Sequence, residues 1–196
     1  MVAKQEILTI FEAYFHRGSE IVQNKEYSWD PQGRLNIHTG VSREFGHPMP
    51  DGMWPVSFGY IDGGCNMQNC GLHDIEGGPI EVYQDLDLSF NPLTNLKGLT
   101  TRIGGRLLLE GIKFKSLDGL PPDQSVEISW YPDQPMLRLL TCKWIELPWH
   151  QMQEKGDSPA KKVLTILRKY RRHGRRAMFD CQKELEDAGF DGNARW

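Results

Sequence analysis

Two cysteines and a histidine lie close together near the middle of the chain and invite a metal-binding interpretation. Cys65, Cys70 and His73 offer the sulfur and imidazole ligands that zinc accepts. Structural zinc sites generally add a second pair of ligands to a C-x(2–4)-C unit, and no complementary pair follows here. A free cysteine also behaves as a small buried hydrophobe. We therefore expect both thiols in the core and predict no metal site and no cofactor.

Paired carboxylates are a second candidate for chemistry. Asp85 and Asp87 lie on one face of a predicted strand and could bind a cation, but no third acidic residue occupies an adjacent column. The chain contains no phosphate-binding loop, no H-E-x-x-H motif and no G-x-S-x-G motif. Its histidines are scattered, without a cysteine or carboxylate at helical spacing. We expect no enzymatic activity.

A strongly basic segment is the third candidate. Its cations lie within sixteen residues and are Lys161, Lys162, Arg168, Lys169, Arg171, Arg172, Arg175 and Arg176. Such a run can neutralise phosphates or dock an acidic partner. Tyr170 is its only interleaved aromatic residue, so stacking on single-stranded nucleic acid is poorly supported. Nucleic-acid binding through residues 161–176 remains an alternative function, although most such runs are solvated helix faces.

The elements that must position these residues are repeated units. Residues 62–124 fall into three rows of 21 that begin at Asp62, Tyr83 and Gly104. Apolar residues recur in fixed columns, namely Cys65, Leu86, Leu107; Met67, Leu88, Leu109; Leu72, Leu93, Phe114; and Ile75, Leu96, Leu117. Ile61, Val82 and Ile103 close the rows. This period, with its L-x-L-x-x-N-x-L core, is typical of leucine-rich repeats, which stack side by side and bury a shared core.

The neighbours of the inward columns must point outward, because side chains alternate along a strand. The outward positions are Gly64, Asn66, Gln68, Asp85, Asp87, Ser89, Arg106, Leu108 and Glu110, with Glu127, Ser129 and Tyr131 in a fourth row that places Ile128 and Trp130 in the strand columns. Mixed charge with a few apolar anchors suits protein recognition. We predict that this face, except Gly64, binds a partner protein.

The flanking segments predict caps. Residues 1–26 form an amphipathic helix that Gly18-Ser19 can kink, and residues 27–61 form a hairpin, with a turn at 30–33, and a degenerate repeat. Residues 62–150 hold the repeats and a closing segment that includes Trp144 and Ile145. In residues 151–196, Ser158-Pro159 starts a basic helix and Gly189 ends the last one. The predicted fold is an α+β solenoid with one small parallel-type sheet, an N-terminal helix and hairpin cap, and a C-terminal helical cap.

Composition bounds the function. The net charge of −3 argues against a general polyanion binder. No apolar stretch approaches the ~18 residues that cross a bilayer, and the N-terminus does not resemble a secretory signal. The four cysteines do not form a dense disulfide framework, which favours thiols and the cytosol.

Several segments together resemble the short leucine-rich-repeat proteins encoded by large tailed bacteriophages, whose rows look like N-x-L-T-S-L-x-G-x-P-x-x-V. The segments are 55–61 (PVSFGYI), 91–99 (NPLTNLKGL), 114–121 (FKSLDGLP), 179–185 (FDCQKEL) and 187–194 (DAGFDGNA). The resemblance covers about residues 27–130 and 160–196. Cys70 and Ile112 replace the asparagine expected in two rows, so we expect its hydrogen-bond ladder to be broken.

The resemblance implies a non-enzymatic, phage-encoded protein in the host cytoplasm that docks a host bacterial protein, with inhibition of a defence or toxin component as the leading hypothesis. A virion or assembly component is a further alternative. The partner's identity and the oligomeric state stay open at this point.

Overall fold

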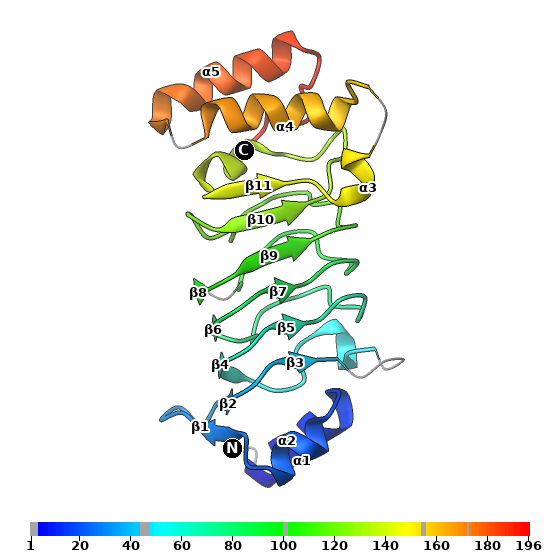
Figure 1. Cartoon of the computed structure of the whole chain (residues 1–196), viewed down its shortest axis with the longest axis vertical. Helices are drawn as coiled ribbons and strands as arrows, with labels where there is room; N and C mark the ends of the chain where they lie inside the picture. Colours follow the sequence, from blue (N-terminus) through cyan, green and yellow to red (C-terminus); the bar gives the residue numbers. More distant parts are fainter. Residues whose placement is uncertain (1–3, 44–47, 100–101, 154–155, 172) are drawn as a thin grey trace.

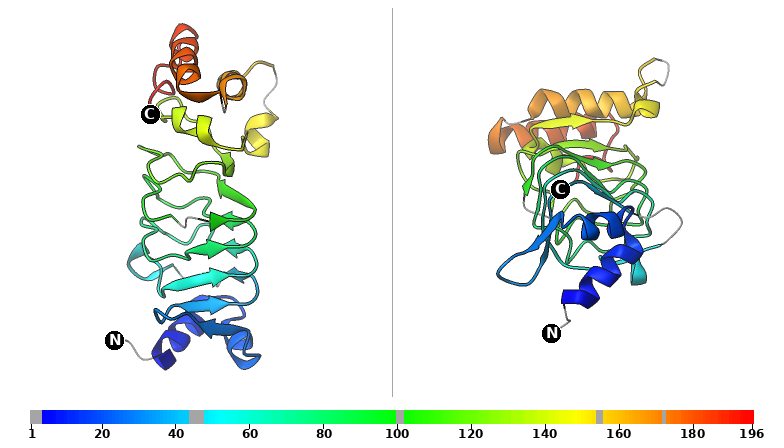
Figure 2. Two further views of the ribbon diagram at one scale, coloured as in Figure 1. Left: turned by 90° about the vertical axis from the view of Figure 1, so that its left-hand side faces the viewer. Right: turned by 60° about the horizontal axis from the view of Figure 1, so that its bottom comes forward.

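The chain winds into a β-solenoid with helices at both ends. The computed structural model describes residues 4–43, 48–99, 102–153, 156–171 and 173–196, without the side chains of residues 174–176. The chain makes about five turns, stacked along the long axis of the molecule (Figure 1). Viewed from the side, strands stack along one edge of the solenoid and loops return along the other (Figure 2). The solenoid architecture predicted from the sequence is therefore confirmed.

Two sheets run along the solenoid. The hairpin sheet has the order β1-β2-β4-β6-β8 and contains β1 (Tyr27–Trp29), β2 (Leu35–Ile37), β4 (Phe58–Ile61), β6 (Glu81–Val82) and β8 (Arg102–Ile103). The long sheet has the order β11-β10-β9-β7-β5-β3 and contains β3 (Val41–Ser42), β5 (Cys65–Asn66), β7 (Leu86–Asp87), β9 (Arg106–Leu109), β10 (Ser125–Ile128) and β11 (Trp144–Glu146). Among the described strands, β1 and β2 pair antiparallel and the other pairings are parallel.

The prediction of one small sheet is wrong. Ile61, Val82 and Ile103, which close the rows in the sequence, belong to short strands that hydrogen-bond to one another from turn to turn. A corner of two or three residues then leads each of these strands into the long sheet. Because Ile61 and Val82 are buried like the leucines that follow them, both strands of a turn line the same core.

The register of the long sheet shows how far the rows repeat. Cys65 pairs with Leu86 and Leu86 with Leu107, each 21 residues apart. Val41 and Cys65 are 24 apart, whereas Leu107 and Val126 are 19 apart. The turn length is therefore not constant along the solenoid.

The shorter turn corrects the predicted fourth row. Val126 and Ile128, not Ile128 and Trp130, pair with Leu107 and Leu109. Trp130 instead lies beyond the end of β10, where its indole N–H donates to the side-chain oxygen of Asn193 at 3.0 Å. The turn that leads into β10 is two residues shorter than the two 21-residue turns before it, which moves the residues of the fourth row by two positions.

The predicted inward columns form the core. Met67, Leu72, Leu88, Leu96, Leu107 and Leu109 are fully buried, and the remaining column residues are buried to nearly the same extent. Cys65, Cys70, Cys142 and Cys181 are also buried, as free thiols. Burying this contiguous apolar set is the main favourable term for folding. The assignment of Cys65 and Cys70 to the core is confirmed.

The N-terminal end is closed by two short helices, α1 (Lys4–Tyr14) and α2 (Gly18–Gln23). The predicted helix is thus broken, and Arg17 at the junction adopts a left-handed φ of 57°. The ring of Phe15 stacks on Phe11 with centroids 4.9 Å apart and meets Phe58 of β4 edge-on at 5.4 Å. These aromatic contacts fix the cap on the first turn.

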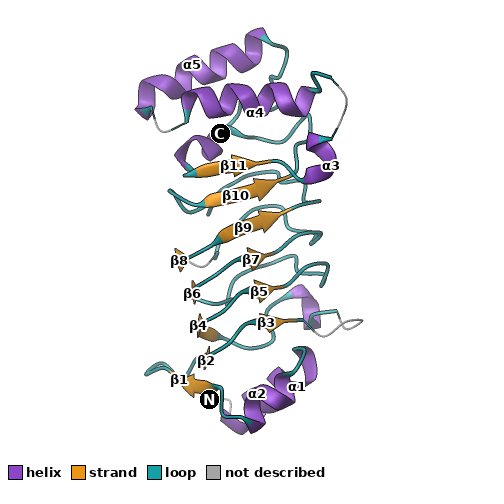
Figure 3. Ribbon diagram, viewed as in Figure 1, coloured by secondary structure: helices purple, strands orange, loops and turns teal. Residues whose placement is uncertain are grey.

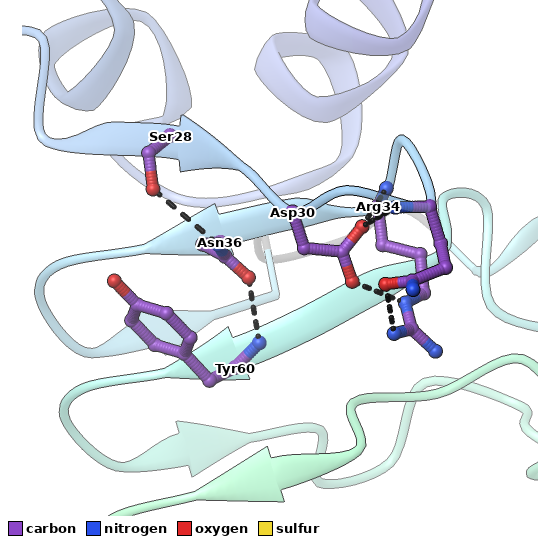
Figure 4. Close-up of polar contacts among 6 residues, drawn as sticks. Ser28, Asp30, Arg34, Asn36 and Tyr60 are labelled. Atoms are coloured by element: carbon purple, nitrogen blue, oxygen red, sulfur yellow. Dashed lines mark hydrogen bonds and ion pairs between the residues drawn. The ribbon is translucent and has the colours of Figure 1, made fainter.

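The predicted hairpin follows, and its turn is held by side chains (Figure 4). The Asp30 carboxylate accepts the backbone N–H groups of Gln32 and Arg34, both at 2.9 Å, and pairs with the Arg34 guanidinium. The Asn36 side-chain oxygen accepts the backbone N–H of Tyr60 at 3.1 Å, which joins β2 to β4. The hairpin is therefore joined to the parallel strands of the solenoid through β2 and β4.

The C-terminal end carries the longer helices (Figure 3). They are α4 (Pro159–Tyr170), which Ser158 caps as predicted, and α5 (Gly174–Asp187), preceded by α3 (Trp149–Met152) and the 3-10 helix η2 (Leu137–Thr141); a second 3-10 helix, η1 (Pro50–Gly52), lies in the degenerate repeat. Gly189 takes the left-handed conformation (φ 81°) expected after α5. None of the described helices is long and apolar enough to cross a membrane.

Candidate functional site

The outer face of the long sheet carries one continuous row of mostly polar side chains. Strand pairing aligns Ser42, Asn66, Asp87, Leu108, Glu127 and Glu146, one from each strand. Because side chains alternate, residues flanked by the buried column Cys65, Leu86 and Leu107 must point outward. Asn66, Asp87, Leu108 and Glu127 were predicted on this face, and the structure brings them together.

A second outward row contains Asp85, directly before β7, and Arg106 of β9, and the two residues are linked. The Asp85 carboxylate accepts the backbone N–H of Arg106 at 2.7 Å and lies 3.2 Å from its guanidinium. Another guanidinium nitrogen is 3.9 Å from the Glu127 carboxylate on β10. Arg106 thus lies between two carboxylates. Such exposed pairs contribute only about 0–1 kcal/mol each, so their main effect is to order the surface.

Carboxylates outnumber cations on this face. Five of them gather along β7, β9, β10 and β11, namely Asp85, Asp87, Glu110, Glu127 and Glu146. Burial raises the pKa of Glu127; Arg106 opposes this shift, and Glu110, Glu146 and Asp87 reinforce it. His150 of α3 lies 3.2 Å from Glu110. Within these outward rows, negative charges therefore outnumber positive ones.

A hollow of about 450 Å³ opens at the N-terminal end of this face. Gly40 and Gly64 leave its floor free of side chains, and Asn66, Asp85, Asp87 and Leu108 line it. His16 and Arg17, from the junction of α1 and α2, also line it. The Arg17 guanidinium donates to both carboxylate oxygens of Glu20 at 2.6 Å. The N-terminal helices therefore help shape the site as well as covering the core.

Sequence reasoning missed the residues at both ends of the face. His16 and Arg17 belong to a segment that we expected to act only as a lid. Trp144 was assigned with Ile145 to the closing of the core, but only Ile145 is fully buried, and Trp144 is 45 % exposed. The alternation of Trp144, Ile145 and Glu146 is the signal that could have identified β11 as a strand of this sheet.

Some predicted outward residues do not lie on the face. Ser89 and Ser129 are buried, so their predicted outward orientation is wrong. The Ser89 hydroxyl accepts the backbone N–H of Glu110 at 3.1 Å, and the Ser129 hydroxyl accepts that of Gly111 at 2.9 Å. Strands β7 and β10 end just before these serines, so strict alternation no longer applies. Both serines connect consecutive turns.

Gln68 and Tyr131 also lie beyond the strand ends. Gln68 is exposed, and its backbone N–H donates to the Asn66 side chain at 3.0 Å. Tyr131 is half-buried, and its carbonyl accepts the side-chain amide of Asn193 at 2.9 Å. Glu110 follows β9 directly and keeps its place at the edge of the face through His150.

The thiols are unsuited to surface chemistry. Burial raises the pKa of Cys70 to about 11, and the same cause raises the pKa of Cys65 further. The Cys70 thiol donates to the carbonyl of Met67 at 2.9 Å. Within the described ranges, no group of three His, Cys, Asp or Glu residues is placed to hold a metal ion.

Much of the predicted basic patch contacts the protein itself. The Arg168 guanidinium donates to the carbonyl of Ile145 at 3.1 and 2.7 Å and lies over the Trp144 ring, with Arg171 also 5.3 Å from that ring. Lys169 forms an ion pair with Glu184.

Lys161 and Lys162 belong to the first turns of α4, where the Lys161 ammonium donates to the carbonyl of Gly156 and Lys162 is exposed. Arg172 lies outside the described residues, as do the side chains of Arg175 and Arg176. Arg168 and Lys169 are exposed, as expected for a solvated helix face, and Arg171 is half-buried. All three also contact the C-terminal cap or β11.

No protein-family model, no curated protein and no solved structure matches this chain.

Proposed function

We propose that this protein is a non-enzymatic binding module that docks a partner protein on the outer face of the long sheet. The observation that carries the proposal is the continuous row from Ser42 to Glu146, which crosses all six strands. Half-buried Leu108 lies near its centre and is flanked by Asp87 and Glu127. An apolar centre with a polar rim is the usual composition of a protein interface.

The finer proposal is that the solenoid is a leucine-rich repeat of the bacteriophage type. The motif at residues 91–99 supports it, as do the pairings between residues 21 apart in the central turns. The hydrogen bonds that Asn91 makes to two turns also support it. On this proposal the partner is a host bacterial protein in the host cytoplasm, and binding inhibits a defence or toxin component.

The test compares affinity capture from bacterial lysates by the intact protein and by two matched variants. The face variant combines Leu108→Glu with Glu127→Lys. The control combines Ile80→Glu with Glu76→Lys, which makes the same net change of charge at exposed residues away from the long sheet. Urea unfolding establishes that both variants keep the stability of the parent.

We expect the parent and the control to retain the same protein, identified by mass spectrometry, and the face variant to lose it. Capture that is undiminished in the face variant would contradict the assignment of the binding face. A parent chain that retains no protein in stoichiometric amount would contradict the binding function itself.

A further inference from the structure

We infer that the partner binds this face through a peptide segment that carries lysine or arginine, with one cationic side chain in the hollow over Gly40 and Gly64. The inference rests on the proposed function and names the chemistry of its partner. Charge, shape and the position of Leu108 support it separately.

The charge of the face selects a cation. Five carboxylates, Asp85, Asp87, Glu110, Glu127 and Glu146, lie on or beside the two rows, and Arg106 is the arginine within the rows. At the β11 end, Arg168 lies over Trp144 and attracts Glu146, and His150 lies beside Glu110, so the carboxylates next to the hollow are the ones with least cationic company. Arg106 is already shared between Asp85 and Glu127. A partner that brings further cations relieves repulsion among the remaining carboxylates and gains charge-assisted hydrogen bonds. An acidic segment would add like charges and be rejected.

The shape of the hollow suits a long side chain. In the outward row that contains Asp85 and Arg106, the two preceding positions are Gly64 and Gly40, so nothing rises from the sheet there. Asp85 and Asp87 line the same hollow and offer carboxylate oxygens to a cationic head group. The Arg17 guanidinium on another wall is engaged by Glu20. A lysine or arginine can therefore lay its methylene stem over the glycines with its charged end at the aspartates.

Leu108 provides the neighbouring contact. It lines the same hollow as Asp87 and pairs with it across β7 and β9. A partner segment that places an apolar residue beside its cation covers Leu108 while the cation meets Asp87. The face therefore favours mixed cationic and apolar segments over purely polar ones.

Fluorescence anisotropy with synthetic peptides tests the inference. The probe is a short fluorescein-labelled peptide in which Lys or Arg alternates with Leu, spaced by Ser and Gly; its counterpart carries Glu at every cationic position. We expect the cationic probe to bind the intact protein and to bind more weakly when the salt concentration is raised from about 0.05 M to about 0.2 M. We expect the Glu counterpart to show no measurable binding.

Three variants locate the binding. Asp85→Asn with Asp87→Asn removes the charges but keeps the oxygens that accept the N–H groups of Arg106 and Ser89. Gly64→Leu fills the hollow without changing charge; its Cβ would meet the Asp85 carbonyl at 3.4 Å, an ordinary contact. Glu186→Gln with Asp187→Asn removes two exposed carboxylates from the C-terminal cap as the control. We expect the first two to weaken binding by about tenfold or more and the control to bind like the parent.

Equal binding of both peptides, no binding of the cationic peptide, or unchanged binding to Gly64→Leu would each overturn the inference. The last result would mean that charge alone attracts the probe. These failures differ from failure of the proposed function. A host protein that is captured by the parent and lost by the Leu108→Glu, Glu127→Lys variant would leave the docking face standing even if both peptides fail to bind.

Discussion

The side-chain oxygen of Asn91 accepts the backbone N–H of Leu72, one turn earlier in the solenoid, over 3.0 Å. Gln134 does the same for Phe114, over 2.9 Å. Leu72 and Phe114 belong to one inward column, and Leu93 lies between them. The residue that would make the same hydrogen bond to the N–H of Leu93 is Ile112, which has no polar side chain. The hydrogen-bond ladder is therefore interrupted at Leu93, as expected. Gln134 restores it one turn later, in a segment whose sequence does not follow the repeat.

Replacing Asn91 should destabilise the whole solenoid. Its oxygen also accepts the N–H of Cys70, and its amide donates to the carbonyls of Met67 and Leu88 at 2.7 and 2.8 Å. Asn91→Ala leaves these buried groups without partners, so we expect a loss of about 3–5 kcal/mol in the free energy of unfolding. Urea unfolding measures it. Asn95 is half-buried, and its side-chain oxygen accepts the N–H of Lys97 in a solvent-exposed hydrogen bond. Asn95→Ala should therefore cost only about 1 kcal/mol; a cost equal to that of Asn91→Ala would contradict the buried ladder.

Two glycines with similar backbones should respond differently to alanine. Gly77 and Gly119 both have positive φ, 83° and 92°. A Cβ at Gly77 meets nothing within 4 Å, whereas one at Gly119 would lie 2.0 Å from the carbonyl oxygen of Leu96. We expect Gly77→Ala to cost about 1–2 kcal/mol from backbone strain alone and Gly119→Ala clearly more. Thermal unfolding of the two variants measures the difference. Equal falls in melting temperature would contradict the close approach of Gly119 to the Leu96 carbonyl of the preceding turn.

Two glutamates should affect the pH dependence of stability with opposite signs. Burial raises the pKa of Glu127, so the folded state binds more protons than the unfolded state above the ordinary glutamate pKa. The stability that this protonation gives is full below that pKa and is lost as the pH rises through the raised value. We therefore expect Glu127→Gln to match or exceed the parent in stability at neutral pH, with the difference vanishing in acid.

Glu184 should give the opposite pH dependence of stability. Hydrogen bonds from Lys169 and Tyr170 lower its pKa, so its contribution is present above the ordinary glutamate pKa and is lost as the pH falls through the lowered value. Glu184→Gln should be less stable than the parent at neutral pH and equal to it in strong acid. Urea unfolding across pH measures both; a change of the same sign for the two variants would show that one of these environments is wrongly described.

Arg168 should matter for stability rather than for binding nucleic acid. Its guanidinium donates twice to the carbonyl of Ile145 and stacks on Trp144. Arg168→Lys keeps the charge but loses the planar stacking and the paired donors, so we expect a loss of about 1–3 kcal/mol in the free energy of unfolding. Lys162→Ala, at an exposed position of the same helix, serves as the control and should change little. If Arg168→Lys were neutral for stability yet weakened retention on heparin, the nucleic-acid alternative would be favoured.

The core residues could be identified from the amino-acid pattern alone. The apolar columns of Leu86, Leu88 and Leu93 could be predicted because side chains alternate along a strand and the rows must stack to bury them. The caps were also local properties, since Ser158 and Gly189 act through backbone groups only a few residues away.

The composition of the outer face depends instead on how the turns pack in three dimensions. Alternation fixes the side on which a residue lies relative to its own strand, but it does not fix where the strand ends or how long the return loop is. Ser89 and Ser129 are therefore buried against the neighbouring turns, and the fourth row is shifted by two residues. The hollow requires the junction at Arg17 to lie beside Asp85, and Arg168 meets a carbonyl 23 residues away. Such contacts depend on long-range packing, which a local pattern does not encode.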